Sequence, residues 1–459
     1  MTPTTEHGFP PEPDEPPDYG NDCERSEIAK EGAYAQVRVG NFARNDRVRS
    51  ADKGVGKLPL RTDDLFYGPL GDIVNVAAGY TEADRVAMLA TLITGVSAFT
   101  GGGNQGEGPH IKIGPDRSPL LLWFLIFGSS GTGRKGTATS VANVFLKRAD
   151  PVLASEIITS GMSSGEGTVN LLKDPDPDSG KPGGTHEKRL FIIEEEFASV
   201  IAKSNYQGST LSATIRLLHS GGPIANLKTE RARASWTHVS ILAHMTRKEF
   251  VSCYSAKDMS GGTYNRFVPV YVDREKVMTR PPVMTEKLIT EQADILRLAI
   301  NRARNVGLID FSDAGGQYWD TVVHPDIDVT EDDSPASEFT RRATTNCWRL
   351  AALYAALDGE SLIDVRHLKA AHALVRYSLD TAAWVFAPGV SDPELEKLFR
   401  YIDEKGLTKL ARTDITRAFG NRIKADRLDA LCERLVESRK FRQVTVPTKG
   451  RPREEFHRC

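Results

Sequence analysis

The chain has few cysteines, and they follow no pattern. Five cysteines are scattered over 459 residues without any C-x-x-C pair: Cys23, Cys253, Cys347, Cys432 and Cys459. This spacing indicates neither a zinc site nor a disulfide framework. It is typical of a protein in a reducing compartment, so we expect a cytoplasmic location.

Long apolar runs and an excess of charge are also missing. The longest apolar run, around residues 120–127, is far too short to span a bilayer, and the N-terminus carries no basic and apolar signal. The formal net charge is only -2, so any surface that binds nucleic acid must be local. A chain of 459 residues exceeds what one core usually organises. We expect a soluble protein of two or three domains with no membrane partner.

The apolar run stops in a basic, glycine-rich turn, GSSGTGRKGT. Residues 120–127 suit a buried parallel strand. Four glycines let the backbone after it turn with its N–H groups pointing inward: Gly128, Gly131, Gly133 and Gly136. Those donors, together with a helix that starts near Thr137, attract phosphate. The sequence therefore predicts a phosphate-binding loop that holds ATP.

The loop departs from the usual G-x-x-x-x-G-K-S/T pattern. Gly128 and Gly133 have the right spacing, but Arg134 stands where lysine is expected, and Lys135 follows one place late. Another glycine then displaces Thr137, the hydroxyl expected to hold Mg²⁺. Either the loop is one residue longer and Lys135 and Thr137 keep their roles, or Arg134 neutralises the phosphates and the magnesium site is altered.

A second apolar strand, Arg189 to Phe197, ends in three carboxylates, Glu194, Glu195 and Glu196. Carboxylates at a strand end are costly unless a cation or a water network uses them. In P-loop enzymes this place supplies one carboxylate to the Mg²⁺ shell and one to polarise the attacking water. We predict the metal role for Glu194 and the base role for Glu195, although Glu196 could replace either. A solvated acidic helix cap is the alternative.

Two further polar groups follow apolar strands. The strand Val239 to Ala243 ends with His244, Thr246 and Arg247, where a side chain can sense the γ-phosphate or the attacking water; a structural histidine is the alternative. Arg266 directly precedes another β-rich run. It could reach the γ-phosphate of a neighbouring subunit, or be a plain surface arginine.

With these motifs, the chain resembles the P-loop ATPases of primase-helicase-like proteins carried by phages, plasmids and integrated mobile elements. The resemblance runs from about Leu65 to Phe386 and rests on DLFYGPLGDIV, GTGRKGT, SSGEG, LFIIEEEF, TLSATIRLLHSGG, HVSILAHMTRKE, YNRF and RLAALYAALDG. Relatives share the GRKGT form. The resemblance implies a replicative helicase or replication-initiation ATPase that works on DNA as a homo-oligomeric ring, such as a hexamer. No primase domain precedes the ATPase, so priming is expected to be absent or to come from another polypeptide.

The composition changes along the chain predict four parts. Residues 1–60 are proline-rich and then basic, which favours a disordered or mobile arm. Residues 61–280 form the α/β, RecA/AAA+-like P-loop core, which includes a helix from Thr81 to Ala98. Residues 281–388 read as a helical lid whose arginines, Arg341, Arg342 and Arg349, could add a second phosphate sensor. After a break at Ala387 to Glu394, residues 393–459 have the order of a winged helix.

Two basic segments are candidates for contact with DNA. A hairpin in IANLKTERARASW carries Lys228, Arg231 and Arg233, which could track a DNA backbone in a ring channel. The wing turn, Thr448 to Pro452, places Arg451 and Arg453 near phosphate. From Tyr401 onward, fifteen Lys or Arg face nine Asp or Glu, which fits a local nucleic-acid footprint. Surface solvation and a protein-docking role are the alternatives.

A second class of function stays open on these residues. The shifted lysine favours a nucleotide-responsive DNA-binding regulator or scaffold that binds ATP without turning it over. The three carboxylates oppose this interpretation, because a site that only binds nucleotide has little use for them.

Overall fold

The computed structural model describes residues 58–102, 108–175, 180, 182–226, 232–254, 259, 261–329, 334–387, 393–421, 423, 425–437, 441–446 and 453–458. Nearly all of the predicted N-terminal arm, residues 1–60, lies outside these ranges.

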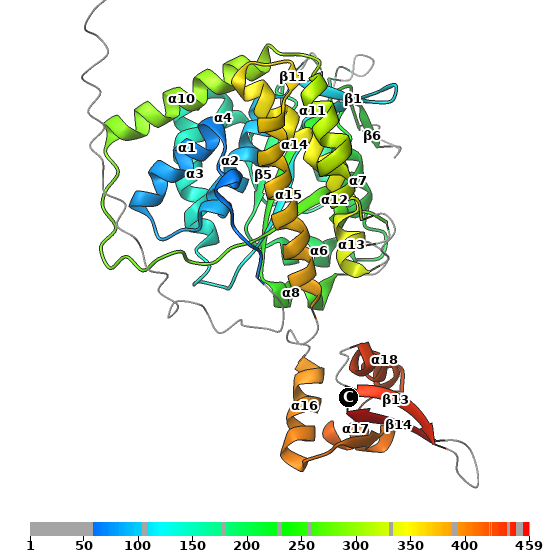
Figure 1. Cartoon of the computed structure of the whole chain (residues 1–459). Coiled ribbons are helices and arrows are strands. Elements are labelled where there is room, and N and C mark those ends of the chain that lie inside the picture. The colour runs from blue at the N-terminus through cyan, green and yellow to red at the C-terminus, as the bar shows by residue number, and fades with distance from the viewer. Residues whose placement is uncertain are drawn as a thin grey trace, which may run out of the picture. The chain divides into compact units, whose positions relative to one another are not determined.

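A five-stranded parallel sheet organises the larger part of the molecule (Figure 1). Its strand order is β4-β5-β8-β3-β9. The strands are β3 (Trp123–Phe127), β4 (Ile158–Thr159), β5 (Arg189–Glu194), β8 (His238–Met245) and β9 (Phe267–Tyr271). Every residue of β3 and β8 is buried, as expected of strands covered on both faces. The predicted α/β class and the predicted apolar strands are confirmed.

Side chains alternate between the two faces of the sheet. Phe124 and Ile126 of β3 belong to one core cluster, and Trp123, Leu125 and Phe127 belong to the other. The first face carries α1 (Gly68–Ala77), α2 (Arg85–Thr100), α3 (Lys135–Ala149), α4 (Pro151–Ile157), α10 (Glu286–Arg304) and α14 (Ala343–Asp358). The second carries α5 (Gly165–Leu172), α6 (Phe197–Ser204), α7 (Leu211–Leu218), α8 (Arg247–Cys253) and α13 (Pro335–Thr340). The long helix α15 (Val365–Phe386) contributes to both clusters.

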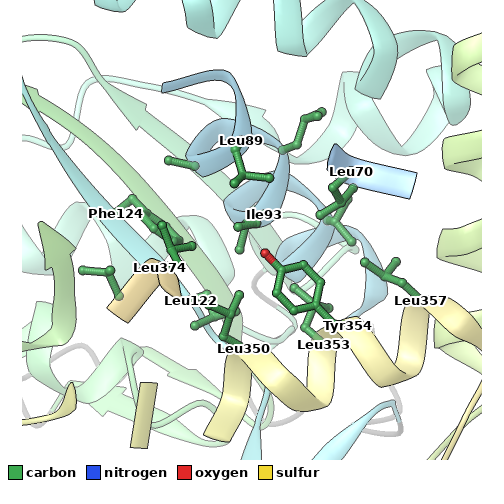
Figure 2. Close-up of a cluster of buried hydrophobic side chains, with 14 of the residues drawn as sticks. Leu70, Leu89, Ile93, Leu122, Phe124, Leu350, Leu353, Tyr354, Leu357 and Leu374 are labelled. Carbon is green, nitrogen blue, oxygen red and sulfur yellow. The ribbon is translucent and has the colours of Figure 1, made fainter. Parts of the chain in front are cut away.

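Helix α2 is the centre of the first cluster. All but one of its residues are buried, because it is apolar around its whole circumference. This confirms the helix predicted at Thr81 to Ala98. Figure 2 shows Leu89 and Ile93 of α2 beside Phe124 of the sheet and Leu350 of α14. The helices predicted as a lid therefore share one hydrophobic core with the sheet.

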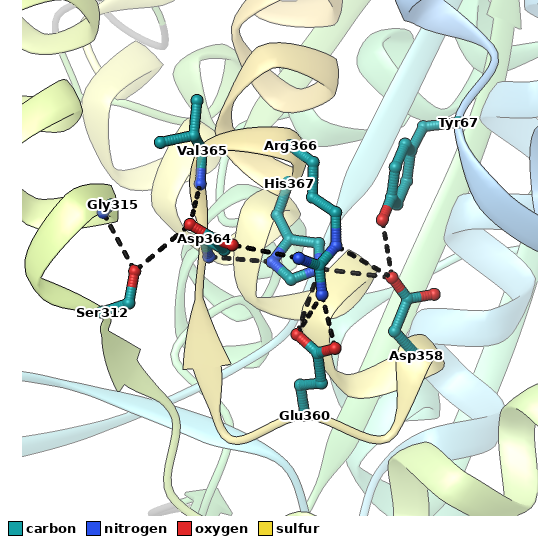
Figure 3. A network of polar contacts seen from close by, with 9 residues as sticks. All are labelled: Tyr67, Ser312, Gly315, Asp358, Glu360, Asp364, Val365, Arg366 and His367. Atoms are coloured by element: carbon teal, nitrogen blue, oxygen red, sulfur yellow. Dashed lines mark hydrogen bonds and ion pairs between the residues drawn. The ribbon is translucent and has the colours of Figure 1, made fainter.

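A polar network joins α1 to the α14–α15 hairpin (Figure 3). The Tyr67 hydroxyl donates to Asp358 Oδ2 at 2.6 Å, and His367 Nε2 lies 3.2 Å from the same oxygen. The Asp364 N–H donates to His367 Nδ1 at 3.0 Å, so the ring proton sits on Nε2 and points at Asp358. Arg366 pairs with Glu360 on the outside. The network fixes the entrance to α1 against the turn between the two long helices.

Several short elements complete this part. β1 (His110–Ile113) and β2 (Asp116–Pro119) form an antiparallel hairpin, and β10 (Asp310–Phe311) pairs with β11 (Leu362–Ile363). α11 (Asp313–Tyr318) and α12 (His324–Ile327) precede α13. β6 (Ile224–Asn226) and β7 (Ala232–Ala234) pair antiparallel, which confirms the predicted hairpin.

The C-terminal residues have a hydrophobic cluster of their own. The element order is α16 (Pro393–Lys405), β12 (Lys409–Ala411), α17 (Arg412–Ala418), α18 (Ala425–Glu437), β13 (Phe441–Val446) and β14 (Arg453–Arg458). The strands form an antiparallel sheet in the order β12-β14-β13. This part thus contains three helices and the β13–β14 ribbon, with β12 as an additional strand. The expected wing turn, Thr448 to Pro452, lies outside the described residues.

Among the described residues, none of the helices combines the length and the apolar character needed to cross a bilayer.

The interior position of β3, between β8 and β9, makes Phe124 a test of the fold. Phe124→Ala should lower the free energy of unfolding by about 3–5 kcal/mol, because the cavity left behind cannot fully collapse. Urea denaturation followed by tryptophan fluorescence measures this change. All five tryptophans precede residue 388, so the signal reports the part of the chain that contains the five-stranded sheet. Leu298→Ala on α10, where the side chain is 55% exposed, is the control and should stay within about 0.5 kcal/mol of the parent chain. A loss at Phe124 as small as that of the control would refute its place in the core.

Candidate functional site

The glycine-rich loop begins where β3 ends, between two neighbouring strands. The Gly128 N–H donates to Met245 O of β8 at 3.2 Å, and the Val272 N–H after β9 donates to Phe127 O at 2.8 Å. A Cβ at Gly128 would lie 2.9 Å from Val272 O, so a larger residue does not fit here. The loop is therefore held from both sides at the carboxyl edge of the sheet.

Within the loop the backbone closes on itself. The Gly133 N–H donates to Ser129 O at 3.0 Å, and a Cβ at Gly133 would lie 2.8 Å from that oxygen. Gly131 has φ +70° and Arg134 has φ +49°, both left-handed. Arginine is unusual in this conformation and costs about 1–3 kcal/mol there, a strain that clusters at ligand-binding sites.

Lys135 and Arg134 point in different directions. Lys135 Nζ donates to Gly128 O at 2.6 Å, inside the loop, and burial lowers the pKa of this lysine. Arg134 instead forms an ion pair with Glu82, with Nη2 3.1 Å from Oε2. Of the two cations that the sequence offered, the structure places Lys135 among the loop carbonyls and Arg134 outside them.

Glu82, which precedes α2, connects the loop to the segment that follows β9. Its Oε1 accepts the Met278 N–H at 2.6 Å, and this bond together with the Arg134 charge lowers the pKa of Glu82. Arg274 lies 3.7 Å from its other oxygen. Sequence reasoning missed Glu82, because it precedes the loop by about fifty residues and carries no local motif.

The acidic triplet is split between two environments. Glu194 is buried, and its Oε1 accepts the Met162 N–H at 2.5 Å. By strand alternation it shares the face of Leu190 and Ile192, away from α3. Glu195 is exposed, and its Oε1 lies 3.4 Å from the Cβ position of Gly136 on the first turn of α3. Glu195 is therefore the carboxylate next to the helix that follows the loop.

Glu196 and Thr137 complete this surface. Glu196 is exposed at the N-cap position of α6, where its side chain makes no capping bond. Thr137 is exposed on the first turn of α3, whereas Gly136 occupies the place of the usual Ser or Thr. The described residues contain no group of three His, Cys, Asp or Glu side chains that could hold a metal by itself.

His244 lies beneath the loop. It is buried, its Nε2 is 3.0 Å from Thr139 Oγ1 of α3, and burial with the nearby Lys135 charge lowers its pKa to about 3. It is thus neutral at pH 7 and links β8 to α3, which favours the structural interpretation over the sensor. The residues after it also have structural partners. Thr246 forms a capping box with Glu249 on α8. The buried Arg247 donates to Val385 O at 3.0 Å.

The structure does not bring Arg266 to the loop of its own chain. Arg266 precedes β9, whose first residue pairs with Trp123, and the loop starts only after Phe127. Four residues of strand correspond to about 13 Å. Burial and neighbouring arginines lower the pKa of Arg266 to about 10. Arg349, another predicted sensor, is buried against Ser118 with a 2.8 Å hydrogen bond.

The predicted DNA-contacting residues are described only in part. Arg233 is exposed on β7, and Arg453 begins β14, where it pairs with Glu455. Lys228, Arg231 and Arg451 lie outside the described residues.

No protein-family model matches this chain, and no curated protein matches it.

The depressed pKa of His244 predicts a pH dependence of stability. In the unfolded chain this imidazole takes up a proton below about pH 6.5, whereas in the folded chain it stays neutral to about pH 3. Its contribution to stability is therefore complete above pH 6.5 and declines as the pH falls toward 3, by up to about 1.4 kcal/mol per pH unit. His244→Asn should reduce the slope of unfolding free energy against pH between pH 4 and 6 by about that amount.

Urea denaturation at several pH values measures this slope. Burial also lowers the pKa of His238 to about 4, so part of the slope remains in the His244 variant. His324→Asn, a change at an exposed residue of α12, is the control. An unchanged slope in the His244 variant would contradict a neutral, buried imidazole.

Proposed function

We propose that this chain is an ATP-dependent DNA-processing protein of the primase-helicase-like P-loop type, acting as the replicative helicase or replication-initiation ATPase of a mobile element. The observation that carries the proposal is the loop at the end of β3, with Lys135 turned into it and Glu195 beside the following helix. Parallel α/β sheets bind their ligands at the carboxyl ends of the strands. A triphosphate placed there meets backbone donors, a lysine and a carboxylate together.

In the proposed mechanism, the loop N–H groups and the start of α3 hold the phosphates. Lys135 exchanges Gly128 O for phosphate oxygens, which restores a charged partner to a partly buried ammonium. Arg134 stays on Glu82 and fixes the left-handed turn before α3. The variant loop is thus one residue longer, and Lys135 takes the usual lysine role.

Mg²⁺ suits the oxygen donors of this surface, since it is bound in NTP sites by one or two protein oxygens and by phosphates. Thr137 on α3 and the exposed Glu196 would supply such oxygens. A Mg²⁺ ion held there would neutralise charge on the phosphates. Glu194, which the sequence suggested for the metal, already accepts the Met162 N–H, so we transfer that position to Glu196. Glu195, beside the first turn of α3, keeps the base role and orients the attacking water.

We also propose that the chain works as a ring of subunits. Arg266 lies at the amino end of β9, away from the glycine-rich loop of its own chain, so in this proposal it acts on the nucleotide bound by a neighbouring copy. The β6–β7 hairpin with Arg233 and the C-terminal residues then provide the contacts with DNA. In the C-terminal residues, α17 and α18 followed by the β13–β14 ribbon have the order of a winged helix.

A regulator or scaffold that binds ATP without turnover remains the second candidate, and two observations favour it. Lys135 is satisfied by a loop carbonyl and Glu194 by a backbone N–H without nucleotide. ATP turnover that rises with single-stranded DNA separates the ATPase from a protein that only binds nucleotide.

The ATPase proposal predicts that Glu195→Gln binds ATP but hydrolyses it at least about 100-fold more slowly, since general-base assistance is worth 10²–10⁴. Steady-state hydrolysis with single-stranded DNA and equilibrium ATP binding give the two readouts. Glu194→Gln is the matched control: its amide oxygen still accepts the Met162 N–H, and turnover should fall far less. Hydrolysis by Glu195→Gln at the parent rate would reject its role.

The DNA proposal predicts that Arg451→Ala with Arg453→Ala weakens binding of duplex DNA. Each lost phosphate contact should lower the slope of log affinity against log salt by about 1. Fluorescence anisotropy at several salt concentrations measures both quantities. Arg417→Ala, whose side chain pairs with Asp414 on α17, is the control. Equal affinity and slope in the double variant would exclude the wing as a DNA contact.

A further inference from the structure

We propose that Arg216, Arg266 and Arg342 form a second anion site that binds the doubly charged terminal phosphate of a nucleoside triphosphate or polyphosphate. The three side chains come from distant parts of the sequence: α7, the turn before β9 and the junction of α13 with α14. All three are partly buried. The site is separate from the glycine-rich loop, because it lies before β9 whereas the loop follows the opposite end of β3.

One short turn, Gly262–Arg266, brings the three guanidinium groups together. The Thr263 hydroxyl accepts Arg216 Nη1 at 3.0 Å. Asn265 Oδ1 accepts Arg342 Nε at 3.2 Å. Arg266 itself donates back to Gly262 O and, through Nε at 3.3 Å, to Arg216 O. Gly262 has φ +76°, and a Cβ there would lie 3.1 Å from Arg266 Nη1, so the turn needs glycine to hold the arginines this closely.

The acceptors around this cluster are all neutral. Arg216 donates to two hydroxyls, Arg342 to an amide oxygen and Arg266 to two carbonyls. In the part of the chain that the structure describes, no carboxylate pairs with any of the three. Burial, and after it repulsion from Arg342 and Arg216, lower the pKa of Arg266 to about 10, which leaves it charged at pH 7. Three like charges gathered without a counter-ion favour an anionic ligand.

The unused donors define the ligand. Each guanidinium has five N–H donors. Within the described ranges, no acceptor binds Nε or Nη2 of Arg216, Nη2 of Arg266 or either terminal nitrogen of Arg342. Such a set matches the three oxygens of a terminal phosphate. A dianion also balances three positive charges better than the single charge of a phosphodiester, which is why we choose a terminal phosphate over a nucleic-acid backbone.

This proposal shares Arg266 with the ring contact but does not require hydrolysis or assembly. The experiment is therefore done on the full chain carrying Lys135→Ala, so that the loop no longer competes for phosphate. Titration calorimetry with tripolyphosphate should show one binding event per chain. Arg342→Gln in this background should weaken it at least tenfold, whereas Arg297→Gln, on the exposed side of α10 beside Asp294, should leave it unchanged.

Three results would overturn the proposal. The first is the absence of tripolyphosphate binding to the Lys135→Ala chain, and the second is equal affinity after Arg342→Gln is added. The third is displacement of tripolyphosphate by an oligonucleotide that lacks terminal phosphates, which would assign the cluster to a nucleic-acid backbone. The melting temperature without ligand checks folding: Arg342→Gln should match or exceed its parent, because the substitution removes one repelling charge. If that variant melts lower, Arg216→Gln tests the same tenfold loss. If the chain without any substitution fails to bind ATP, this result would refute only the nucleotide-binding role of the glycine-rich loop.

Discussion

The site depends on one packing constraint, the burial of β3 between β8 and β9. Parallel strands on both sides leave β3 no free edge, and the loop begins where the strand ends, at the carboxyl edge of the sheet. There the Gly128 N–H donates to Met245 O and the Val272 N–H donates to Phe127 O, which fixes the junction of strand and loop. The lack of space at Gly128 excludes any side chain. This fixed junction of strand and loop determines where the start of α3, Lys135 and Glu195 lie.

The charged residues next to the loop are held by the same part of the sheet. Arg134 adopts a left-handed conformation that arginine disfavours, and its pair with Glu82 compensates for part of that strain. Glu82 is in turn held by the Met278 N–H on the chain that follows β9. Among the described residues, no carboxylate pairs with Arg266 before β9, whose guanidinium donates only to backbone carbonyls. We use this contrast in the charge of the partners to distinguish the structural role of Arg134 from the binding role of Arg266.

The strands, helix α2 and the C-terminal order could be predicted from apolar spacing and glycine position, because these signals are local. The roles of neighbouring residues could not. Arg134 and Lys135 are adjacent, yet one backbone angle sends them to different partners. Likewise Glu194 and Glu195 face opposite sides of a strand end, and only the Met162 N–H shows which is already occupied. Glu82 and Thr263 were missed, since their partners lie far away in sequence.

We propose that Lys135, and not Arg134, holds the phosphates of a nucleotide. Equilibrium binding of ATP with Mg²⁺ to the full chain, compared between Lys135→Ala and Arg134→Ala, tests this assignment. We predict a loss of at least about tenfold for Lys135→Ala, because removing a charged partner of an anion costs 1.5–3 kcal/mol. Arg134→Ala should lose clearly less. The reverse order, or equal binding by both variants and the parent chain, would contradict the claim.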